Sequence, residues 1–393
     1  MFNKKFVIGA IIIIIVLLVI VANNINYSAT SSKDINPTIL FQTSKSSDEV
    51  NYTISINKMI DTYIIASALY LDFDSRIILP NTEEHSIYKK AKEFFIPYKN
   101  HSFIKSMHKY VNNGDVNGDV IGVLLSYSPT ASLNKLHNVD DKYKRYLFKE
   151  DKDIEIFIRG LKDFYKDSNA NKFFSCNKAL DRKVKTYIQK NTKESKIIEL
   201  IKSTEEYVNT KNKYFGELPV AYETVLTIFR PSMASFYSYE TKNGFKIISF
   251  QSPNDISQNP YKLDICNFVE NVIHEFLHSY INEPIYNITI SNCKDISKYY
   301  TSIVNNKMYS SMPLTRQIDE YIVRAIEGRI YSQTFGEEYA KKTIINKEIE
   351  FGGFERLGEI YNMLSNYEKD RDKYLAIDDF LPQLVEELTR RAE

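Results

Sequence analysis

Two histidines four residues apart, His274 and His278, and the glutamate between them are the residues best suited to chemistry in this sequence. On a helix, positions i and i+4 project from the same face, so both imidazoles can bind one metal ion. Glu275 can reach a water molecule held at that metal and accept its proton. The His-Glu-x-x-His pattern therefore predicts a Zn²⁺ (Zn2+) site for hydrolysis, with Glu275 as the catalytic base.

The residues around this motif predict a buried helix over about 264–282, ending before Pro284. Polar positions share one stripe, and apolar side chains cover the rest of the helix surface. A polar stripe on such a helix is costly unless it is satisfied or functional. A chance match to the motif in this chain is expected on the order of 0.01 times. A metal site is therefore favoured over two histidines that merely hydrogen-bond within a core.

The sequence shortly after the two histidines offers no third metal ligand. Ile281 and Pro284 stand where one type of zinc site has a glycine and its third ligand. A carboxylate from a later helix, predicted over residues 315–333, gives a two-histidine, one-carboxylate site with water as the fourth ligand. This helix offers three donors, which are Asp319, Glu320 and Glu327. We favour Glu320, and Asp319 is the alternative because it lies closer to the apolar stripe of the helix.

Two further polar side chains lie one helical turn from the predicted ligands. Arg324 follows Glu320 by four residues, so it can hydrogen-bond the ligating carboxylate or a substrate carbonyl. An ordinary surface ion pair accounts for this spacing equally well. Asn271 precedes His274 by one turn, and either supports the metal site or simply faces the cleft.

The segments Val272–Tyr280 and Glu320–Ala325 resemble the gluzincin branch of zinc peptidases. With Lys92–His101, they more closely resemble an uncharacterised bacterial family of extracytoplasmic metallopeptidases known only as a domain of unknown function. The likeness covers roughly residues 55–335. Arg324 departs from the gluzincin pattern, which often has an acidic residue four positions after the third ligand.

This resemblance implies a site, a fold and a substrate. The zinc ligands would be His274, His278 and Glu320, and Glu275 would be the base. The fold would be zincin-like, and a peptide or protein substrate would add as an extended strand along the sheet edge. No local motif identifies the residue that would stabilise the oxyanion.

The amino-terminal residues predict attachment to a membrane. Lys4 and Lys5 precede an uncharged apolar run over residues 6–22. As a helix this run spans roughly 25 Å, near the lower limit for crossing a bilayer, and the lysines favour a cytoplasmic amino terminus. We expect residues 1–23 to be an uncleaved single-pass anchor in the cell membrane, with the catalytic part extracytoplasmic. A cleaved signal peptide, and hence a secreted protein, is the alternative.

The remaining chain predicts an α+β protein. Polar residues predict a flexible stalk over residues 24–52, and helical periodicity predicts a mostly helical domain over residues 53–215. Residues 216–393 predict a zincin-like domain with a small sheet, the metal-binding helix and further helices. Three runs of aromatic and β-branched residues predict an antiparallel meander, with strands at 224–229, 234–240 and 245–251.

Composition limits the partners. The net charge of +1, without a strongly basic stripe, argues against binding to nucleic acid. The three cysteines, Cys176, Cys266 and Cys293, match no zinc spacing, and the sequence does not determine which of them form a disulfide. We expect Cys176 and Cys266 to be small buried side chains. Asp115–Asp119 begins like a calcium loop but lacks its glycine and its last acid, so we expect a polar turn.

Two other functions are compatible with these features. The first is a non-catalytic exported protein that uses the same scaffold to bind peptide or cell-wall material. The second is a metal-dependent hydrolase that acts on another class of substrate. The complete motif favours a peptidase over the first, because a scaffold without activity would be expected to lose Glu275 first.

Overall fold

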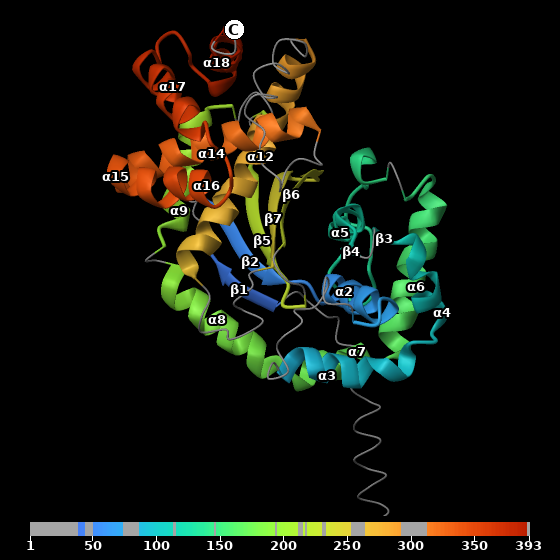
Figure 1. The fold of residues 1–393 in the computed structure, drawn as a ribbon. Helices are drawn as coiled ribbons and strands as arrows, with labels where there is room; N and C mark the ends of the chain where they lie inside the picture. The colour runs from blue at the N-terminus through green and yellow to red at the C-terminus, as the bar shows by residue number, and fades with distance from the viewer. Residues whose placement is uncertain are drawn as a thin grey trace, which may run out of the picture.

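The computed structural model describes residues 38–43, 50–73, 86–112, 115–144, 147–192, 195–210, 215–216, 218–229, 233–252, 264–291 and 313–390 (Figure 1). The predicted anchor at residues 1–23 and much of the predicted stalk lie outside these residues. Within them, no helix has both the length and the apolar character needed to span a bilayer. The described chain is mostly helical with a small sheet, so the α+β prediction is confirmed at that level.

The main sheet has five strands in the order β1-β2-β5-β7-β6. Strands β6 (Met233–Thr241) and β7 (Gly244–Ser252) form at the predicted positions. The first strand, predicted over residues 224–229, is shifted towards the amino terminus: β5 spans Val220–Leu226 and pairs with β2 and β7 along this length. The predicted antiparallel meander is wrong, because β7 lies between β5 and β6 and pairs with β5 in parallel. The burial of β7 explains this order: most of its residues are buried, as in a central strand, whereas β6 is largely half-exposed and lies at an edge.

The other two strands come from outside the predicted zincin-like part. Strand β2 (Asn51–Ile56) pairs in parallel with β5, and β1 (Thr38–Gln42) pairs antiparallel with β2. The predicted stalk over residues 24–52 is therefore wrong where β1 and the start of β2 form. The sheet joins residues on both sides of the predicted boundary at residue 215. Apolar side chains of β2 explain its place, because Tyr52 and Ile54 are fully buried.

A set of helices and short elements lies between β2 and β5 in the sequence. Asn57 caps its first helix by accepting hydrogen bonds from Met59 and Ile60. The stretch that begins like a calcium loop forms β4 and the cap of α5, where Asn117 accepts from Asp119. The elements are α2 (Lys58–Tyr70), α3 (Ser86–Phe95), η1 (Ile96–Tyr98), α4 (Ser102–Ser106), η2 (Met107–Lys109), β3 (Val111–Asn112), β4 (Asp115–Val116), α5 (Gly118–Leu125), η3 (Asp141–Tyr143), α6 (Asp151–Asp167), α7 (Ala170–Cys176), α8 (Lys178–Thr192) and α9 (Ile197–Val208).

The C-terminal helices begin with α12 (Ile265–Ser291), which carries the His-Glu-x-x-His motif. The predicted end before Pro284 is wrong: the helix continues through this proline, and Pro284 and Ile285 are buried. Burial of these apolar side chains offsets the hydrogen bond that proline removes. The following elements are α14 (Leu314–Phe335), α15 (Glu337–Ala340), the π-helix η4 (Lys341–Ile345), α16 (Asn346–Glu350), α17 (Leu357–Lys369) and α18 (Ile377–Arg390).

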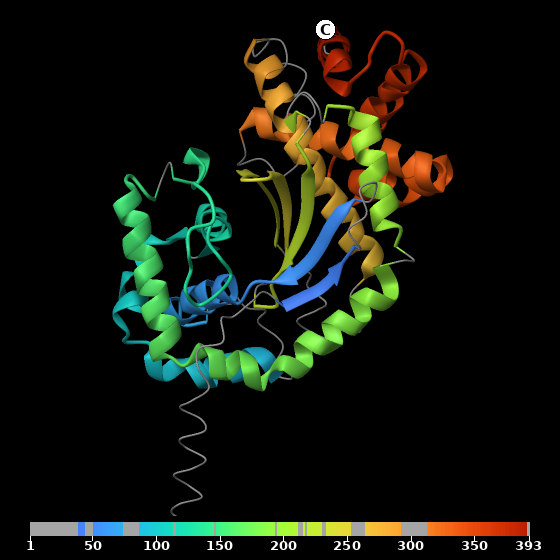
Figure 2. The ribbon, with the colours of Figure 1, turned by 180° about the vertical axis from the view of Figure 1, so that it is seen from behind.

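Helix α12 packs on one face of the sheet. Its Phe276 ring lies 5.0 Å from the ring of Tyr222 on β5 and 6.2 Å from that of Tyr52 on β2. Figures 1 and 2 show the N-terminal helices α2–α7 as a lobe beside β6, and the helices α14–α18 gathered at the other side of the molecule. Helix α8 runs from the N-terminal lobe towards β1 (Figure 2). The motif helix is therefore held between the sheet and the C-terminal helices.

The cysteines differ from the prediction. Cys176 and Cys266 are both exposed free thiols, so the expectation that they are buried is wrong. Each lies on the outer face of its helix, beside residues that are buried in the core, because helical periodicity places neighbouring positions on different faces. Cys293 lies outside the described residues.

Candidate functional site

Helix α12 buries the three residues of the motif. His274, Glu275 and His278 are 9%, 7% and 5% exposed. The apolar residues around them fix the helix in the core, since Val272, Ile273 and Leu277 are completely buried. The two imidazole rings are perpendicular, at 89°, with centroids 4.8 Å apart. This arrangement directs the Nε2 atoms of both rings to one place, where they lie 3.1 Å from each other.

Helix α14 brings Glu320 to the same place. Its Oε2 atom lies 3.4 Å from Nε2 of His274, and its Oε1 atom lies 3.5 Å from Nε2 of His278. Within the described residues, these three form the group of His, Cys, Asp and Glu side chains whose ligand atoms converge closely enough to hold a metal ion. Glu320 is the carboxylate that the sequence favoured, 42 positions after His278.

The spacing of these atoms fits a small tetrahedral ion. With zinc-to-ligand bonds of about 2.0–2.1 Å and tetrahedral angles, neighbouring ligand atoms lie roughly 3.3–3.4 Å apart. The observed separations of 3.1, 3.4 and 3.5 Å bracket that value. Two imidazoles and one carboxylate are also a donor set that zinc binds in catalytic sites. The residues present therefore fit a zinc ion, with a fourth position left for water or substrate.

The second ring nitrogen of each histidine has an acceptor beside it. Nδ1 of His278 lies 2.8 Å from Oδ1 of Asn282, and Nδ1 of His274 lies 3.4 Å from Oε2 of Glu327. In a neutral imidazole, an acceptor beside Nδ1 favours the proton on that nitrogen, which leaves the Nε2 lone pair available to a metal. Glu327, named among the possible ligands, thus lies behind the first histidine, at 2% exposure.

Asn282 is a residue that the sequence analysis missed. Asn271, one turn before His274, is exposed, whereas Asn282, one turn after His278, contacts the imidazole. The signal was present, because positions 278 and 282 share one face of the helix through the i,i+4 relation. Because the predicted helix ends at about residue 282, Asn282 stands at its last position, where helix ends fray, whereas in the structure it lies well inside α12.

Asp319 does not join the cluster. It is 4% exposed, its Oδ2 lies 3.9 Å from Arg316, and its Oδ1 has no hydrogen-bond partner among the described residues. Burial raises the pKa of this carboxyl to about 8, with Arg316 opposing the rise. The structure thus places Glu320 beside the histidines and its neighbour Asp319 elsewhere, since adjacent helix positions point about 100° apart.

Arg324 is a half-buried cation at the margin of the cluster. Its Nη1 atom contacts the Glu320 carboxylate and lies 3.3 Å from Nε2 of His274. Its Nε atom donates to Glu348 at 2.8 Å, and its guanidinium lies 4.4 Å from the centre of the Phe354 ring. Because these contacts hold it from three sides, Arg324 is positioned more firmly than a surface ion pair would be.

Burial and neighbouring charges together set the protonation of the cluster. Burial raises the pKa of Glu275 to about 7, although nearby His274 lowers it. Burial and the Arg324 charge lower the pKa of His274, but its contacts with Glu320 and Glu327 outweigh them and raise it to about 10. Burial opposes ionisation of Glu320 too, yet the His274 contact and Arg324 hold its pKa well below the usual range. The cluster therefore favours a negative carboxylate among positive neighbours.

The edge strand β6 also reaches the cluster. The ring of Phe236 stacks on the His278 imidazole, with centroids 5.3 Å apart and planes at 21°. Nothing in the sequence near Phe236 indicates this role, because the contact joins residues 42 positions apart through the sheet. The site thus lies where α12, α14 and the edge of the sheet meet.

The fold and site define an α+β protein in which two buried histidines and one half-buried carboxylate form a cluster that could hold a metal ion. The chain belongs to the family described as "Domain of unknown function (DUF4932)", whose model matches residues 53–387. No curated protein and no solved structure matches the chain. The description of the family assigns no activity, so the function must be argued from the site.

Proposed function

We propose that this protein is a zinc-dependent peptidase in which His274, His278 and Glu320 bind the metal. The observation that supports this most directly is the triangle of ligand atoms with sides of 3.1, 3.4 and 3.5 Å. The oriented Nδ1 atoms of both histidines support it further. When bound, such an ion supplies a Lewis acid and makes water nucleophilic at neutral pH.

Glu275 is the proposed general base. It is buried beside His274, and burial raises its pKa to about 7, a value suited to accepting a proton near neutrality. In the proposed reaction, water adds its hydroxyl group to the amide carbonyl carbon. Its proton passes to Glu275 and from there to the departing amine as the C–N bond breaks.

Arg324 is the proposed stabiliser of the negative charge that develops on the carbonyl oxygen. Its Nη1 atom lies 3.3 Å from Nε2 of His274, so its charge acts at the reacting centre. The ion pair with Glu348 and the Phe354 ring hold the guanidinium in place before substrate binds. A cation that is already oriented stabilises developing charge without a reorganisation cost.

A peptide is the proposed substrate because a sheet edge passes the cluster. Edge strands carry unpaired N–H and C=O groups, and an extended peptide can add to them as a further strand. Phe236 of β6 stacks on His278, so a peptide paired with this strand would run past the metal ligands. We further propose an extracytoplasmic location at the cell membrane, supported by the apolar run over residues 6–22.

Metal content tests the proposal first. Protein purified without added metal is expected to contain about one zinc per chain, and Glu320→Ala to lose it or bind it much more weakly. Asp319→Ala is the matched control, because Asp319 precedes Glu320 on α14 and lies outside the cluster. No zinc in the wild type after metal is offered would refute the site. Equal zinc in wild type and Glu320→Ala would remove Glu320 as a ligand.

Activity is tested separately from metal binding. Zinc-loaded wild type is expected to hydrolyse casein or synthetic peptides, and Glu275→Gln to keep zinc but lose hydrolysis. A Gln variant that retains turnover would contradict the general-base role. Bound zinc without hydrolysis of any peptide or ester would instead favour a non-catalytic binding protein on this scaffold.

A further inference from the structure

Strand β6 ends the sheet within the described residues, and its outward main-chain groups can be identified. On β7, Gln251 and Phe245 form main-chain bonds towards the β5 side, at 3.0 and 2.9 Å. In an antiparallel ladder, opposite residues alternate between bonded and non-bonded pairs. The β6 partners of these two residues are therefore non-bonded. The residues that point N–H and C=O away from β7 are Ala234, Phe236, Ser238 and Glu240.

One half of this edge lies at the metal cluster. The side chain of Phe236 is on the same face as α12 and stacks on His278. The outward groups of Ala234 and Phe236 are therefore the ones that a substrate strand would use beside the ligands. Strand residues rise by about 3.3 Å each, so Ser238 lies about 6.6 Å further along the edge.

The other half is covered by residues 135–143 of the N-terminal lobe, which we call the cover segment. Nζ of Lys142 lies 3.4 Å from both the carbonyl oxygen and Oγ of Ser238. The His137 ring stacks on Tyr239, with centroids 3.8 Å apart and planes at 21°. The cover segment thus contacts the outward carbonyl of Ser238, which a substrate strand would otherwise use.

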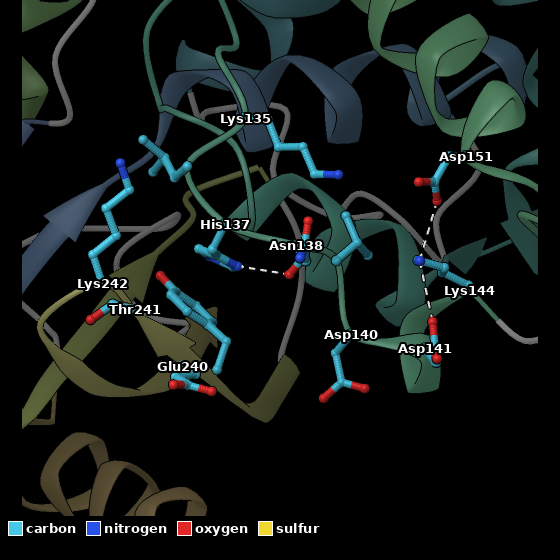
Figure 3. A pocket seen from close by; sticks show the side chains of 13 residues that line it. Lys135, His137, Asn138, Asp140, Asp141, Lys144, Asp151, Glu240, Thr241 and Lys242 are labelled. Carbon is cyan, nitrogen blue, oxygen red and sulfur yellow. Dashed lines mark hydrogen bonds and ion pairs between the residues drawn. The ribbon is translucent and has the colours of Figure 1, made fainter. Parts of the chain in front are cut away.

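Around the stacked rings of His137 and Tyr239, the cover segment and the β6–β7 hairpin also leave open space between them. They line an open groove of about 990 Å³, to which the cover segment contributes Lys135 and His137 and the hairpin contributes Glu240, Thr241 and Lys242 (Figure 3). Charged side chains of both signs line it, and Lys144 is held by Asp141 and Asp151 at 3.2 Å each. A polar chain end can be solvated in this groove, whereas a continuous strand would have to displace the cover segment.

We propose that the cover segment stops a substrate strand from pairing with β6 beyond Ser238. Only about two substrate residues then fit on that side of the scissile bond. This inference rests on the proposed peptidase function. We take the substrate to pair antiparallel with β6, the commoner arrangement of paired strands, so that it runs from the Glu240 end to the Met233 end. The restricted side is therefore the amino-terminal side, and the substrates are short peptides or the amino-terminal ends of longer chains.

A series of unstructured peptides tests the limit. The peptides share one cleavage sequence and carry one to six additional residues at the amino end, and zinc-loaded wild type cleaves them under identical conditions. We expect kcat/KM to fall at least tenfold once the extension exceeds about two residues. Mass spectrometry of the products identifies the bond that breaks. Equal kcat/KM across the series would overturn the inference while leaving the peptidase function intact.

Substitutions connect the limit to the cover segment. Lys142→Ala removes the contact with Ser238 and is expected to raise kcat/KM for three- and four-residue extensions at least threefold. Lys144→Ala is the matched control, because Lys144 pairs with Asp141 and Asp151. An equal change in kcat/KM for the extended peptides in both variants would refute the role of Lys142. If zinc-loaded wild type cleaves no peptide at all, the proposed function fails and the inference fails with it.

A proline on the edge gives a second measurement. Ala234→Pro removes an outward N–H that takes no part in the ladder with β7, so the sheet is expected to tolerate it. Zinc content should stay at one per chain, while kcat/KM for the shortest peptide falls at least tenfold. Unchanged cleavage by a zinc-loaded Ala234→Pro variant would show that the substrate does not pair with β6, and would overturn the inference.

Discussion

The contact between Asn282 and His278 gives the sharpest test of how the cluster is organised. Asn282→Ala removes an acceptor 2.8 Å from Nδ1 of His278 and leaves all three proposed ligands in place. Partners of this kind commonly change metal affinity by about 10–100-fold when removed. Asn282 is half-buried, so water can partly replace its oxygen. We therefore expect the lower end of that range, about tenfold or about 1.4 kcal/mol.

The assay is a zinc competition titration against a chromophoric chelator at constant pH. Asn271→Ala is the matched control, because it is the same substitution on the same helix, at an exposed position. Alanine has a higher helix propensity than asparagine, so neither change should weaken α12, and circular dichroism checks this. Equal zinc affinity in the two variants would refute the argument that Asn282 orients the ligand.

Three other predictions follow from buried charges. Glu327 is 2% exposed, so water has little access to replace its carboxylate. Glu327→Ala should therefore weaken zinc binding about 100-fold, and Glu327→Gln should weaken it less. Equal losses of zinc affinity in the two variants, measured by the same titration, would contradict a role for the charge of Glu327. Arg324→Ala should lower kcat by about 10²–10³-fold while zinc is retained. Arg316 is a more exposed arginine of α14, and Arg316→Ala should leave kcat unchanged; steady-state kinetics with zinc analysis of both variants tests this, and equal kcat values would contradict it. Burial raises the pKa of Asp61 to about 7 from 3.8, although Lys58 and Thr227 oppose it. Between these two values the folded protein holds a proton on Asp61 that the unfolded chain has lost, so stability decreases as pH rises from about 4 through 7. Asp61→Asn should therefore raise Tm more at pH 8 than at pH 5. The same change in Tm at both pH values would refute this.

The motif helix could be predicted because its information is local. The i,i+4 spacing of His274 and His278 determines that both rings share a face wherever the helix forms. The position of Glu320 was harder to predict, because the apolar stripe of its helix pointed towards Asp319. Which of two adjacent carboxylates reaches the histidines depends on how α14 packs against α12, and helical periodicity alone does not contain that information.

The sheet could be predicted only in part, because its pairings are non-local. The hairpin of β6 and β7 has a two-residue turn, so its pairing follows from neighbouring residues. The pairing of β2 with β5 joins residues about 170 positions apart, as between Tyr52 and Tyr222. Short runs such as residues 51–56 carry too little periodicity to distinguish a buried strand from the start of a helix.

The same long-range pairing means that the site cannot be separated from the first part of the chain. Phe276 lies between His274 and His278 in sequence, and its ring packs against Tyr52 of β2 as well as Tyr222 of β5. A fragment starting at residue 216 would lack β2, and with it a fully buried tyrosine beneath the motif helix. Loss of such an aromatic side chain from a core typically costs about 3–5 kcal/mol, a large fraction of the stability of a folded domain. The helix that presents His274 and His278 is therefore positioned by residues more than 200 positions before it, and a shortened chain that keeps the whole sheet must begin no later than Thr38, the first residue of β1.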